Sequence, residues 1–211
     1  MRIGIFGGTF DPPHFGHLIL ASEALDQLHL DKVLWTVTAD PPHKQEQTIS
    51  PVNDRLAMVR AALQGNPAFE ISQVEIDRPG PHYAVDTVKI LQQQYPDAEM
   101  IYLIGADSLR DIPTWHRPRE LIAQVAGFGV MGRPEVNFDL LDLDSQFPGL
   151  TAKVTFIDTP LIQISASLIR ERAAACRPYR YFVPYDVFQF IEKKQLYHGF
   201  GTEKDFPVEQ A

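Results

Sequence analysis

Several features that define other classes of protein are missing from this sequence of 211 residues. Cys176 is the only cysteine, so the chain cannot form an internal disulfide, which fits a reducing compartment. No uncharged apolar stretch reaches the roughly 18 residues that a membrane-spanning helix needs. The N-terminus enters a predicted strand directly, without the basic and apolar segments of a secretory signal peptide. We therefore expect a cytoplasmic protein with no membrane partner.

Positive charge is also scarce, since 19 Lys and Arg residues stand against 27 Asp and Glu residues and give a formal net charge of -8. This balance argues against nucleic acid as a partner, because proteins bind a polymer of phosphates through a surplus of Lys and Arg. It does not exclude a single nucleotide, which needs only a few local donors. The acidic segment Asp139–Asp144 is predicted to form a solvated helix face or a mobile loop.

Short apolar runs alternate with amphipathic segments along the chain, and hydrophobic residues make up 45% of it. Strands that alternate with helices predict an α/β fold, a Rossmann-like doubly wound parallel sheet with right-handed crossovers. We expect one domain over residues 1–198, with a small C-terminal helical segment from about residue 160, and a flexible tail over 199–211. The predicted strands are Ile3–Phe6, Lys32–Thr38, Phe69–Ile76, Glu99–Gly105, Val125–Gly132 and Lys153–Asp158. Helices are predicted at Phe15–Leu30, Tyr83–Gln94, Arg119–Gln124, Ser167–Ala175 and Tyr185–Gln195. A further helix is predicted to begin with Ser50 as its cap and Pro51 as its first residue.

The segment from Arg2 to His17, RIGIFGGTFDPPHFGH, joins a buried-strand pattern to two glycines and a predicted helix N-terminus. Unpaired N–H groups and the positive end of a helix dipole meet at such a junction, which predicts a phosphate site. Gly7 and Gly8 are expected to end the strand in a glycine turn, because glycine allows positive φ and close backbone approach. His14 and His17 lie three residues apart on one helix face, where both imidazoles can donate to the anion.

Other interpretations of this segment stay open. The two glycines alone favour a tight turn without a ligand, and the sequence also allows His14 as a surface loop residue and His17 as a helix cap. The segment lacks the Gly-Lys-Ser/Thr of a Walker loop and the three glycines of a dinucleotide fingerprint. A metal site is the weakest interpretation, because no Cys, Asp or Glu is placed as a third ligand.

A second candidate phosphate site lies in the C-terminal third, where residues 164–170 read ISASLIR. Ser165 and Ser167 are predicted to open a helix, with Arg170 one turn inside it. Helix N–H groups, a serine hydroxyl and a guanidinium together make a phosphate clamp. In isolation a capped helix whose Arg170 pairs with Glu171 is the simpler interpretation. Two helix N-termini able to face one triphosphate favour the clamp.

Polar or glycine-rich residues follow several of the predicted strands, namely Gly7–His17, Asp40–Lys44, Gly105–Asp107 and Arg133. The carboxyl ends of parallel strands meet at one edge of the sheet, and ligands of doubly wound folds bind there. The sequence therefore predicts that these four segments line one binding crevice.

The motif GGTFDPPHFGH, followed at this distance by ISASLIR, resembles the nucleotidylyltransferase superfamily with its HxGH and ISxTxxR signatures. Within it, the chain is similar to the bacterial nicotinate-nucleotide adenylyltransferases over residues 1–195. Ser167 stands where that family more often has threonine, and it keeps the hydroxyl. Further matching segments are PPHK at 41–44, HYAVDTV at 82–88, IGADSLRDIPTW at 104–115 and GRP at 132–134.

The resemblance implies transfer of the adenylyl group of ATP to nicotinate mononucleotide, which gives nicotinate adenine dinucleotide and pyrophosphate in NAD synthesis. The attacking phosphate is ionised near neutral pH, so alignment and charge stabilisation can carry the reaction. Mg²⁺ is expected to bridge the ATP phosphates, held largely by ATP and water. The residues implied as catalytic are His14, His17, Lys44 and Arg170. Those implied in ATP binding are Gly7, Gly8, Thr9, Phe10, His14, His17, Gly105, Asp107, Ile164, Ser165, Ser167 and Arg170.

Within this set, the resemblance places Asp107 at the ATP ribose hydroxyls and the backbone of Ile164 and Ser165 beside the adenine. A cap for the turn at Ser108 is the alternative role of Asp107.

The resemblance also implies an acceptor site. Trp115 is similar to an aromatic residue that stacks on the nicotinate ring, although a tryptophan is more often a core residue. Backbone N–H groups near Tyr83–Val85 and His116 are expected to receive the pyridine carboxylate. The residues implied in acceptor binding are Tyr83, Ala84, Val85, Thr87, Trp115, His116 and Arg133.

Two alternatives to this function remain. The same chemistry fits nicotinamide mononucleotide or another phosphorylated acceptor such as phosphopantetheine. A nucleotide sensor without turnover would lack a reactive group, for example the second histidine or the arginine, and neither is missing here. The sequence leaves open whether the chain forms a homo-oligomer.

Overall fold

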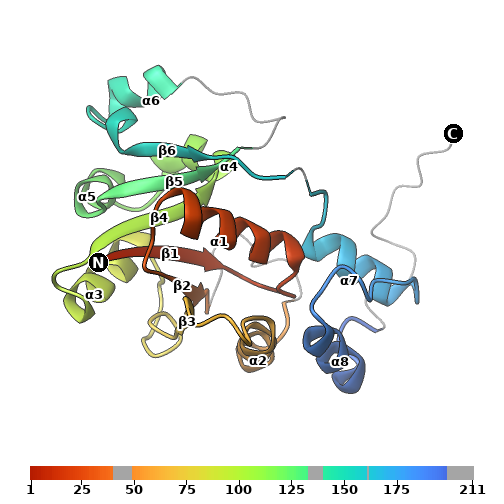
Figure 1. The fold of residues 1–211 in the computed structure, drawn as a ribbon. Coiled ribbons are helices and arrows are strands. Elements are labelled where there is room, and N and C mark those ends of the chain that lie inside the picture. The colour runs from red at the N-terminus through yellow and green to blue at the C-terminus, as the bar shows by residue number, and fades with distance from the viewer. Residues whose placement is uncertain (40–48, 133–139, 161, 199–211) are drawn as a thin grey trace, which may run out of the picture.

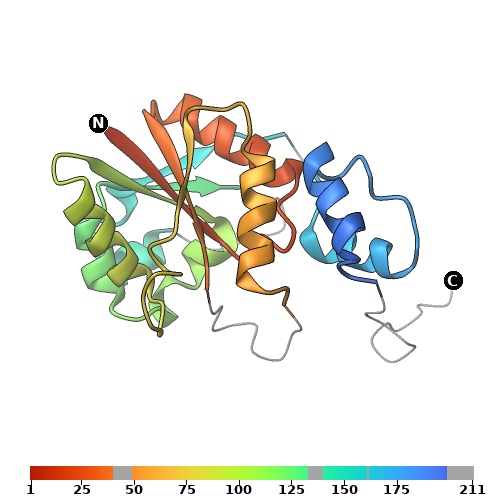
Figure 2. The same ribbon diagram turned by 90° about the horizontal axis from the view of Figure 1, so that it is seen from below.

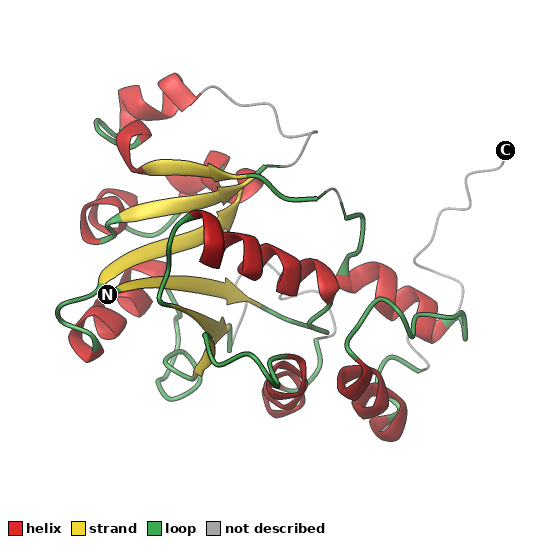
Figure 3. Cartoon of the chain, viewed as in Figure 1, coloured by secondary structure: helices red, strands yellow, loops and turns green. Residues whose placement is uncertain are grey.

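A six-stranded parallel sheet with the strand order β3-β2-β1-β4-β5-β6 forms the centre of the molecule (Figures 1 and 3). The computed structural model describes residues 1–39, 49–132, 140–160 and 162–198. The sequence-based prediction of a doubly wound, Rossmann-like α/β fold is confirmed. The strands are β1 (Arg2–Gly8), β2 (Lys32–Val37), β3 (Phe69–Ser72), β4 (Glu99–Gly105), β5 (Gly127–Met131) and β6 (Val154–Ile157).

Helices cover both faces of the sheet (Figure 2), because the inner strands are apolar on both sides. α1 (Phe15–Gln27) and α2 (Val52–Ala62) pack on the face that presents Phe6 and Trp35. The other face presents Ile5 and Tyr102. It is covered by α3 (Ala84–Gln94), α4 (Ala106–Arg110), the 3-10 turn Ile112–Thr114, α5 (Pro118–Gln124) and α6 (Leu140–Gln146). Within the described ranges, no helix has the length and apolar character needed to cross a bilayer.

The C-terminal helices α7 (Ala166–Ala174) and α8 (Tyr185–Lys194) lie beside α2 (Figure 2). Met58 of α2 shares an apolar cluster with Ile169 and Val187. The helical segment expected from about residue 160 is therefore built onto α2. The division into a domain over 1–198 and a tail stays a prediction, and residues 199–211 lie outside the described residues.

Several boundaries differ from the predictions by one or more residues, and at two of them tertiary contacts override the local pattern. The predicted strand Phe69–Ile76 ends at Ser72, since it is an edge strand that pairs only with β2 before the chain turns under α3. The predicted cap at Ser50 is wrong: Pro51 is the N-cap of α2, and the helix begins one residue later. The backbone of Ser50 instead bonds to Asp11 and Arg55.

The side chain of Arg55 joins the loops that leave β1 and β2. It is 2% exposed, and its guanidinium donates to four backbone carbonyls. The acceptors are Thr9 at 2.9 Å, Thr38 at 2.7 Å, Ala39 at 3.0 Å and Ser50 at 3.0 Å. A planar guanidinium with five donors in a fixed fork suits such a junction. One buried cation thus holds the carboxyl ends of two neighbouring strands to the start of α2.

Arg55→Met should remove these four hydrogen bonds and leave buried carbonyls without partners. We expect the free energy of unfolding in urea to fall by about 3 kcal/mol or more, because each unsatisfied buried polar group costs roughly 1–3 kcal/mol. Arg55→Lys should recover only part of the loss, since an ammonium cannot span all four acceptors. The matched control is Arg60→Met on the exposed side of the same helix. Equal stability of the two Met variants would refute this role.

Candidate active site

The carboxyl ends of β1 and β4 lie side by side at the centre of the sheet. From them the sheet continues in opposite directions, through β2 and β3 on one side and through β5 and β6 on the other. Ligands of open α/β sheets bind at such a switch point. The structure brings together the glycine-containing ends of both strands, Gly7–Gly8 and Gly105, as the sequence predicted.

The turn after β1 is not made by the two glycines, contrary to the prediction. Gly7 and Gly8 are strand residues without positive φ, whereas Phe10 has a φ of 50°. A Cβ on Gly8 would lie 2.8 Å from the Phe10 ring, so glycine makes room for that ring to fold back on the strand. The ring is 2% exposed and packs against Trp35 and His17. The side chain of Phe10 is thus part of the core, and its predicted place in the ATP site stays a prediction that its backbone can serve.

His14 and His17 stack ring on ring at the start of α1, with centroids 3.7 Å apart. The backbone N–H of His14 donates to Nδ1 of His17 at 3.2 Å, so neutral His17 carries its proton on Nε2. A Cβ on Gly16 would lie 3.0 Å from the His14 ring, so glycine lets this ring lie against the first turn. The capping interpretation of His17 is confirmed. The surface-loop interpretation of His14 is wrong, because the residue is 6% exposed.

Burial also sets the charge of His14. It lowers the pKa of His14 to about 4, because the imidazolium would lose its hydration. Nδ1 of this ring is buried and has no hydrogen-bond partner within the described part of the chain. His14 is therefore neutral near pH 7, and a bound anion would favour its protonation.

The start of α7 lies against the loop that leads into α1 (Figure 1). Nη1 of Arg170 donates to the carbonyl of Asp11 at 2.7 Å, and Nη2 donates to Oγ of Ser167 at 3.2 Å. Ser165 caps α7 by accepting an N–H of the first turn at 3.1 Å, so the helix starts one residue earlier than predicted. The hydrogen bonds of Arg170 thus run to the first loop and to its own helix. The two predicted phosphate clamps form one cluster.

Asp11 ties this cluster to two further parts of the chain. Its side chain is 3% exposed. Oδ1 accepts from the hydroxyl of Tyr197 at 2.7 Å, and Oδ2 accepts from the N–H of Ser50 at 3.1 Å. The loop after β1, the start of α2 and the end of the C-terminal helical segment therefore meet at one buried carboxylate.

The residues predicted to border the adenosine also lie close to these helix starts. The carbonyl oxygen of Ile164 is 3.6 Å from the position that a Cβ would take on Gly16. Asp107 folds back over Gly105, where a Cβ would collide with its carboxylate. Oδ1 of Asp107 accepts from the N–H of Ser108 at 3.0 Å. In this structure Asp107 therefore acts as the predicted cap of the turn at Ser108. Its carboxylate lies at the end of β4.

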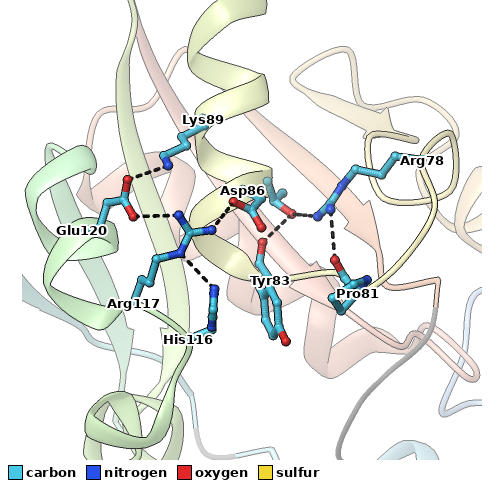
Figure 4. A network of polar contacts seen from close by, with 9 residues as sticks. Arg78, Pro81, Tyr83, Asp86, Lys89, His116, Arg117 and Glu120 are labelled. Carbon is cyan, nitrogen blue, oxygen red and sulfur yellow. Dashed lines mark hydrogen bonds and ion pairs between the residues drawn. The ribbon is translucent and has the colours of Figure 1, made fainter.

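The predicted acceptor residues that the structure describes lie around the N-terminus of α3, and Figure 4 shows Tyr83 and His116 there. Tyr83 is the N-cap, and its ring stacks on His116 with centroids 3.9 Å apart. Arg117 donates to Nε2 of His116 at 2.9 Å and to Asp86 in α3 at 3.1 Å. These contacts hold the first turn of α3 against the loop before α5. N–H groups of a first helical turn have no partner inside the helix, which suits a carboxylate ligand.

Two other predicted acceptor residues differ in what they can reach. Trp115 is half-buried against the core, with its ring 6.1 Å from that of Tyr102 in an edge-to-face arrangement. It keeps an exposed part for stacking. Thr87 is 1% exposed, and its hydroxyl donates to Glu75 at 2.9 Å. The side chain of Thr87 thus points into the protein, and its predicted place in the acceptor site stays a prediction.

Lys44 and Arg133 lie outside the described residues, so their predicted roles stay predictions. Asp11, Arg55 and Glu75 were missed from the sequence, although each is a charged residue inside an apolar or loop segment that the fold buries. Within the ranges that the structure describes, no three His, Cys, Asp or Glu side chains gather closely enough to hold a metal ion.

Comparison with known proteins gives consistent findings. A family model described as cytidylyltransferase-like matches residues 5–172. A protein of Thermomicrobium roseum named probable nicotinate-nucleotide adenylyltransferase is 48% identical over 196 residues, which cover 93% of this chain and 91% of that protein. The nicotinate-nucleotide adenylyltransferase of Bacillus subtilis is 38% identical over 198 residues, or 94% of this chain and 99% of that protein.

Among solved structures, nicotinic acid mononucleotide adenylyltransferase of Plasmodium falciparum complexed with NaAD superposes with a TM-score of 0.76. The match covers 93% of this chain and 97% of that one at 17% sequence identity. The same protein complexed with APC gives a TM-score of 0.75. At this identity the structural likeness shows the fold alone.

The depressed pKa of His14 predicts a loss of stability in acid. The unfolded chain binds a proton at His14 near pH 6.5, whereas the folded chain binds it only near pH 4. Unfolding is therefore favoured as the pH falls from 6.5 toward 4, by up to about 3 kcal/mol. His14→Gln should show a shallower fall in the free energy of unfolding across this window, measured in urea at several pH values. Parallel pH profiles for the two proteins would refute the assignment.

Proposed function

The chain belongs to the cytidylyltransferase-like family and, within it, to the nicotinate-nucleotide adenylyltransferases, and on this premise we propose its reaction. It is an enzyme that transfers the adenylyl group of ATP to nicotinate mononucleotide. The products are nicotinate adenine dinucleotide and pyrophosphate, and the reaction is a step of NAD biosynthesis.

One observation carries this function in the structure: the start of α7 is tied to the loop before α1 by the 2.7 Å bond from Arg170 to Asp11. Two helix N-termini, two imidazoles and a guanidinium then face one place, and each favours phosphate oxygens. This supports a triphosphate spread across both helix starts. His14 and His17 hold it beside α1, and Ser167 and Arg170 hold its β- and γ-phosphates beside α7.

The chemical step needs no general base. A phosphate oxygen of nicotinate mononucleotide attacks the α-phosphorus of ATP, a new P–O bond forms, and the bond to the β-phosphate oxygen breaks to release pyrophosphate. No proton has to move, so the protein acts by alignment and by stabilising charge. Nδ1 of His17 accepts the backbone N–H of His14, so neutral His17 has its proton on Nε2, which is then a donor. It donates to the α-phosphate oxygens as negative charge builds up there.

The acceptor base binds at the start of α3 and the loop before α5. The ring of Trp115 stacks on the pyridine, and first-turn N–H groups near Ala84 and Val85 receive its carboxylate. Because the helix N-terminus carries partial positive charge, this arrangement favours the acid over the neutral amide.

Mg²⁺ enters this reaction with ATP. It prefers phosphate and water oxygens to an all-protein cage, and the donors at the helix starts are nitrogens and hydroxyls, which suit the phosphates rather than the metal. The oligomeric state stays open, and the cytoplasmic location stays a prediction.

An acceptor panel tests the reaction and the substrate together. With Mg²⁺ and ATP, pyrophosphate release should be fastest with nicotinate mononucleotide, slower with nicotinamide mononucleotide, and absent with phosphopantetheine. Chelation of Mg²⁺ by EDTA should abolish release, and added Mg²⁺ should restore it. Equal or faster turnover with the amide would overturn the acid preference. No release with any acceptor would overturn the proposed function and favour a nucleotide sensor.

His17→Ala should lower kcat roughly a hundredfold or more, comparable to the loss of one oxyanion donor. The variant should stay folded with a modestly lower thermal midpoint, because it loses the hydrogen bond from the N–H of His14 to Nδ1 of His17. His29→Asn is the control, since His29 is an exposed histidine away from the site in a left-handed conformation that asparagine tolerates. A kcat for His17→Ala within threefold of the wild type would exclude His17 from the chemical step.

A further inference from the structure

Glu75 is a buried carboxyl group that the proposed mechanism does not use. It follows the edge strand β3 and is 5% exposed. Its Oε1 accepts from the hydroxyl of Thr87 at 2.9 Å, and Arg78 and Thr38 also lie close enough to stabilise its charged form. Burial raises the pKa of Glu75. A buried carboxyl costs stability unless its contacts offset that cost, so its partners matter.

The partner of Glu75 controls the first turn of α3. The hydroxyl of Thr87 lies 3.3 Å from the carbonyl oxygen of Tyr83, which also accepts the backbone N–H of Thr87 at 3.1 Å. Tyr83 is the N-cap of α3, and its ring stacks on His116. Figure 4 shows Tyr83 between Arg78 and the network of His116 and Arg117. The position of Thr87 therefore affects the position of Tyr83 at the start of α3, which faces the acceptor in the proposed function.

Glu75 also acts on Tyr102, the residue whose ring packs against Trp115. Burial and, to a lesser extent, the negative charge of Glu75 raise the pKa of Tyr102 in β4. The ring of Tyr102 packs edge to face against Trp115. Glu75 is thus hydrogen-bonded to the first turn of α3 through Thr87, and its charge acts on the tyrosine that packs against Trp115.

Arg78 is the other group that bonds to Thr87, at 3.2 Å, and it is less confined than Glu75. It lines a cavity of about 580 Å³ between the end of β3 and α3, which Glu75 does not line. Arg78 is half-buried, whereas Glu75 and Thr87 are 5% and 1% exposed, so the bond between Glu75 and Thr87 is better shielded from solvent than the bond between Arg78 and Thr87.

We propose that Glu75 is a positioning residue of the acceptor site, which fixes the first turn of α3 relative to Trp115 through Thr87. This inference rests on the proposed function. Glu75 does not contact the substrate, and its effect appears in the binding of nicotinate mononucleotide rather than in the binding of ATP.

The experiment compares steady-state kinetics of Glu75→Ala, Glu75→Gln and Thr87→Val, with each substrate varied in turn. Glu75→Ala and Thr87→Val should each raise KM for nicotinate mononucleotide about tenfold, the scale of one lost buried hydrogen bond. KM for ATP should stay within twofold. Glu75→Gln should recover KM to within about threefold, because its amide oxygen still accepts from Thr87. The double variant Glu75→Ala with Thr87→Val should be no worse than Glu75→Ala, since both remove the same bond.

Glu70→Ala in β3 is the matched control, an exposed glutamate paired with Lys32, and its kinetics should match the wild type. A KM for nicotinate mononucleotide within twofold of the wild type in Glu75→Ala would refute the proposal. So would an equal rise in both KM values, which indicates general loosening. Should Glu75→Ala not fold, Thr87→Val decides by the same KM criteria. If the wild type makes no nicotinate adenine dinucleotide, the proposed function itself fails and this inference falls with it.

Discussion

The loop between β1 and α1 has to be buried and polar at the same time, and the rest of the site depends on how its hydrogen bonds are satisfied. The buried side chains of Asp11 and Arg55 provide hydrogen-bond partners for this loop and its neighbours. Arg55 binds the carbonyl of Thr9 together with carbonyls after β2, and the carboxylate of Asp11 accepts from Tyr197 and from the start of α2. Each unpaired group would cost free energy in this low-dielectric region. The loop therefore has one well-defined path, and His14 emerges at its end in a fixed position.

This arrangement reconciles the acidic composition with the proposed binding of a polyphosphate. The chain carries a formal charge of -8, yet its proposed phosphate site is built from helix N-termini, a guanidinium and imidazoles. Burial keeps His14 neutral before a ligand arrives, so no uncompensated positive charge has to be stored. The donors are local and oriented, and they do not need a basic surface.

The periodic parts of the sequence predicted the fold well, and the polar interior was not predictable in the same way. Buried strands such as β4 and β5 stand out because both faces are apolar, which gives an uninterrupted run. The edge strand β3 was predicted too long, because alternation continues past Ser72 where pairing with β2 stops. The sequence around Ser50 predicted a helix cap, but its backbone forms tertiary hydrogen bonds with Asp11 and Arg55 instead. The turn predicted at Gly7 and Gly8 lies at Phe10, because packing of its ring over Gly8 compensates for a left-handed backbone.

The sequence by itself determined the strand and helix order, the two phosphate-binding signatures and the family, because these depend on residue types at fixed local spacing. Tertiary structure alone decided that Arg170 binds the carbonyl of Asp11 and that Thr87 turns inward to Glu75. It also decided that the imidazole of His14 is neutral. Such properties depend on burial and on partners far apart in the chain, for example 159 residues between Asp11 and Arg170. The spacing of residues along the chain does not show which distant groups are buried together. Burial and the neighbouring groups in the fold determine both the hydrogen bonds and the protonation states.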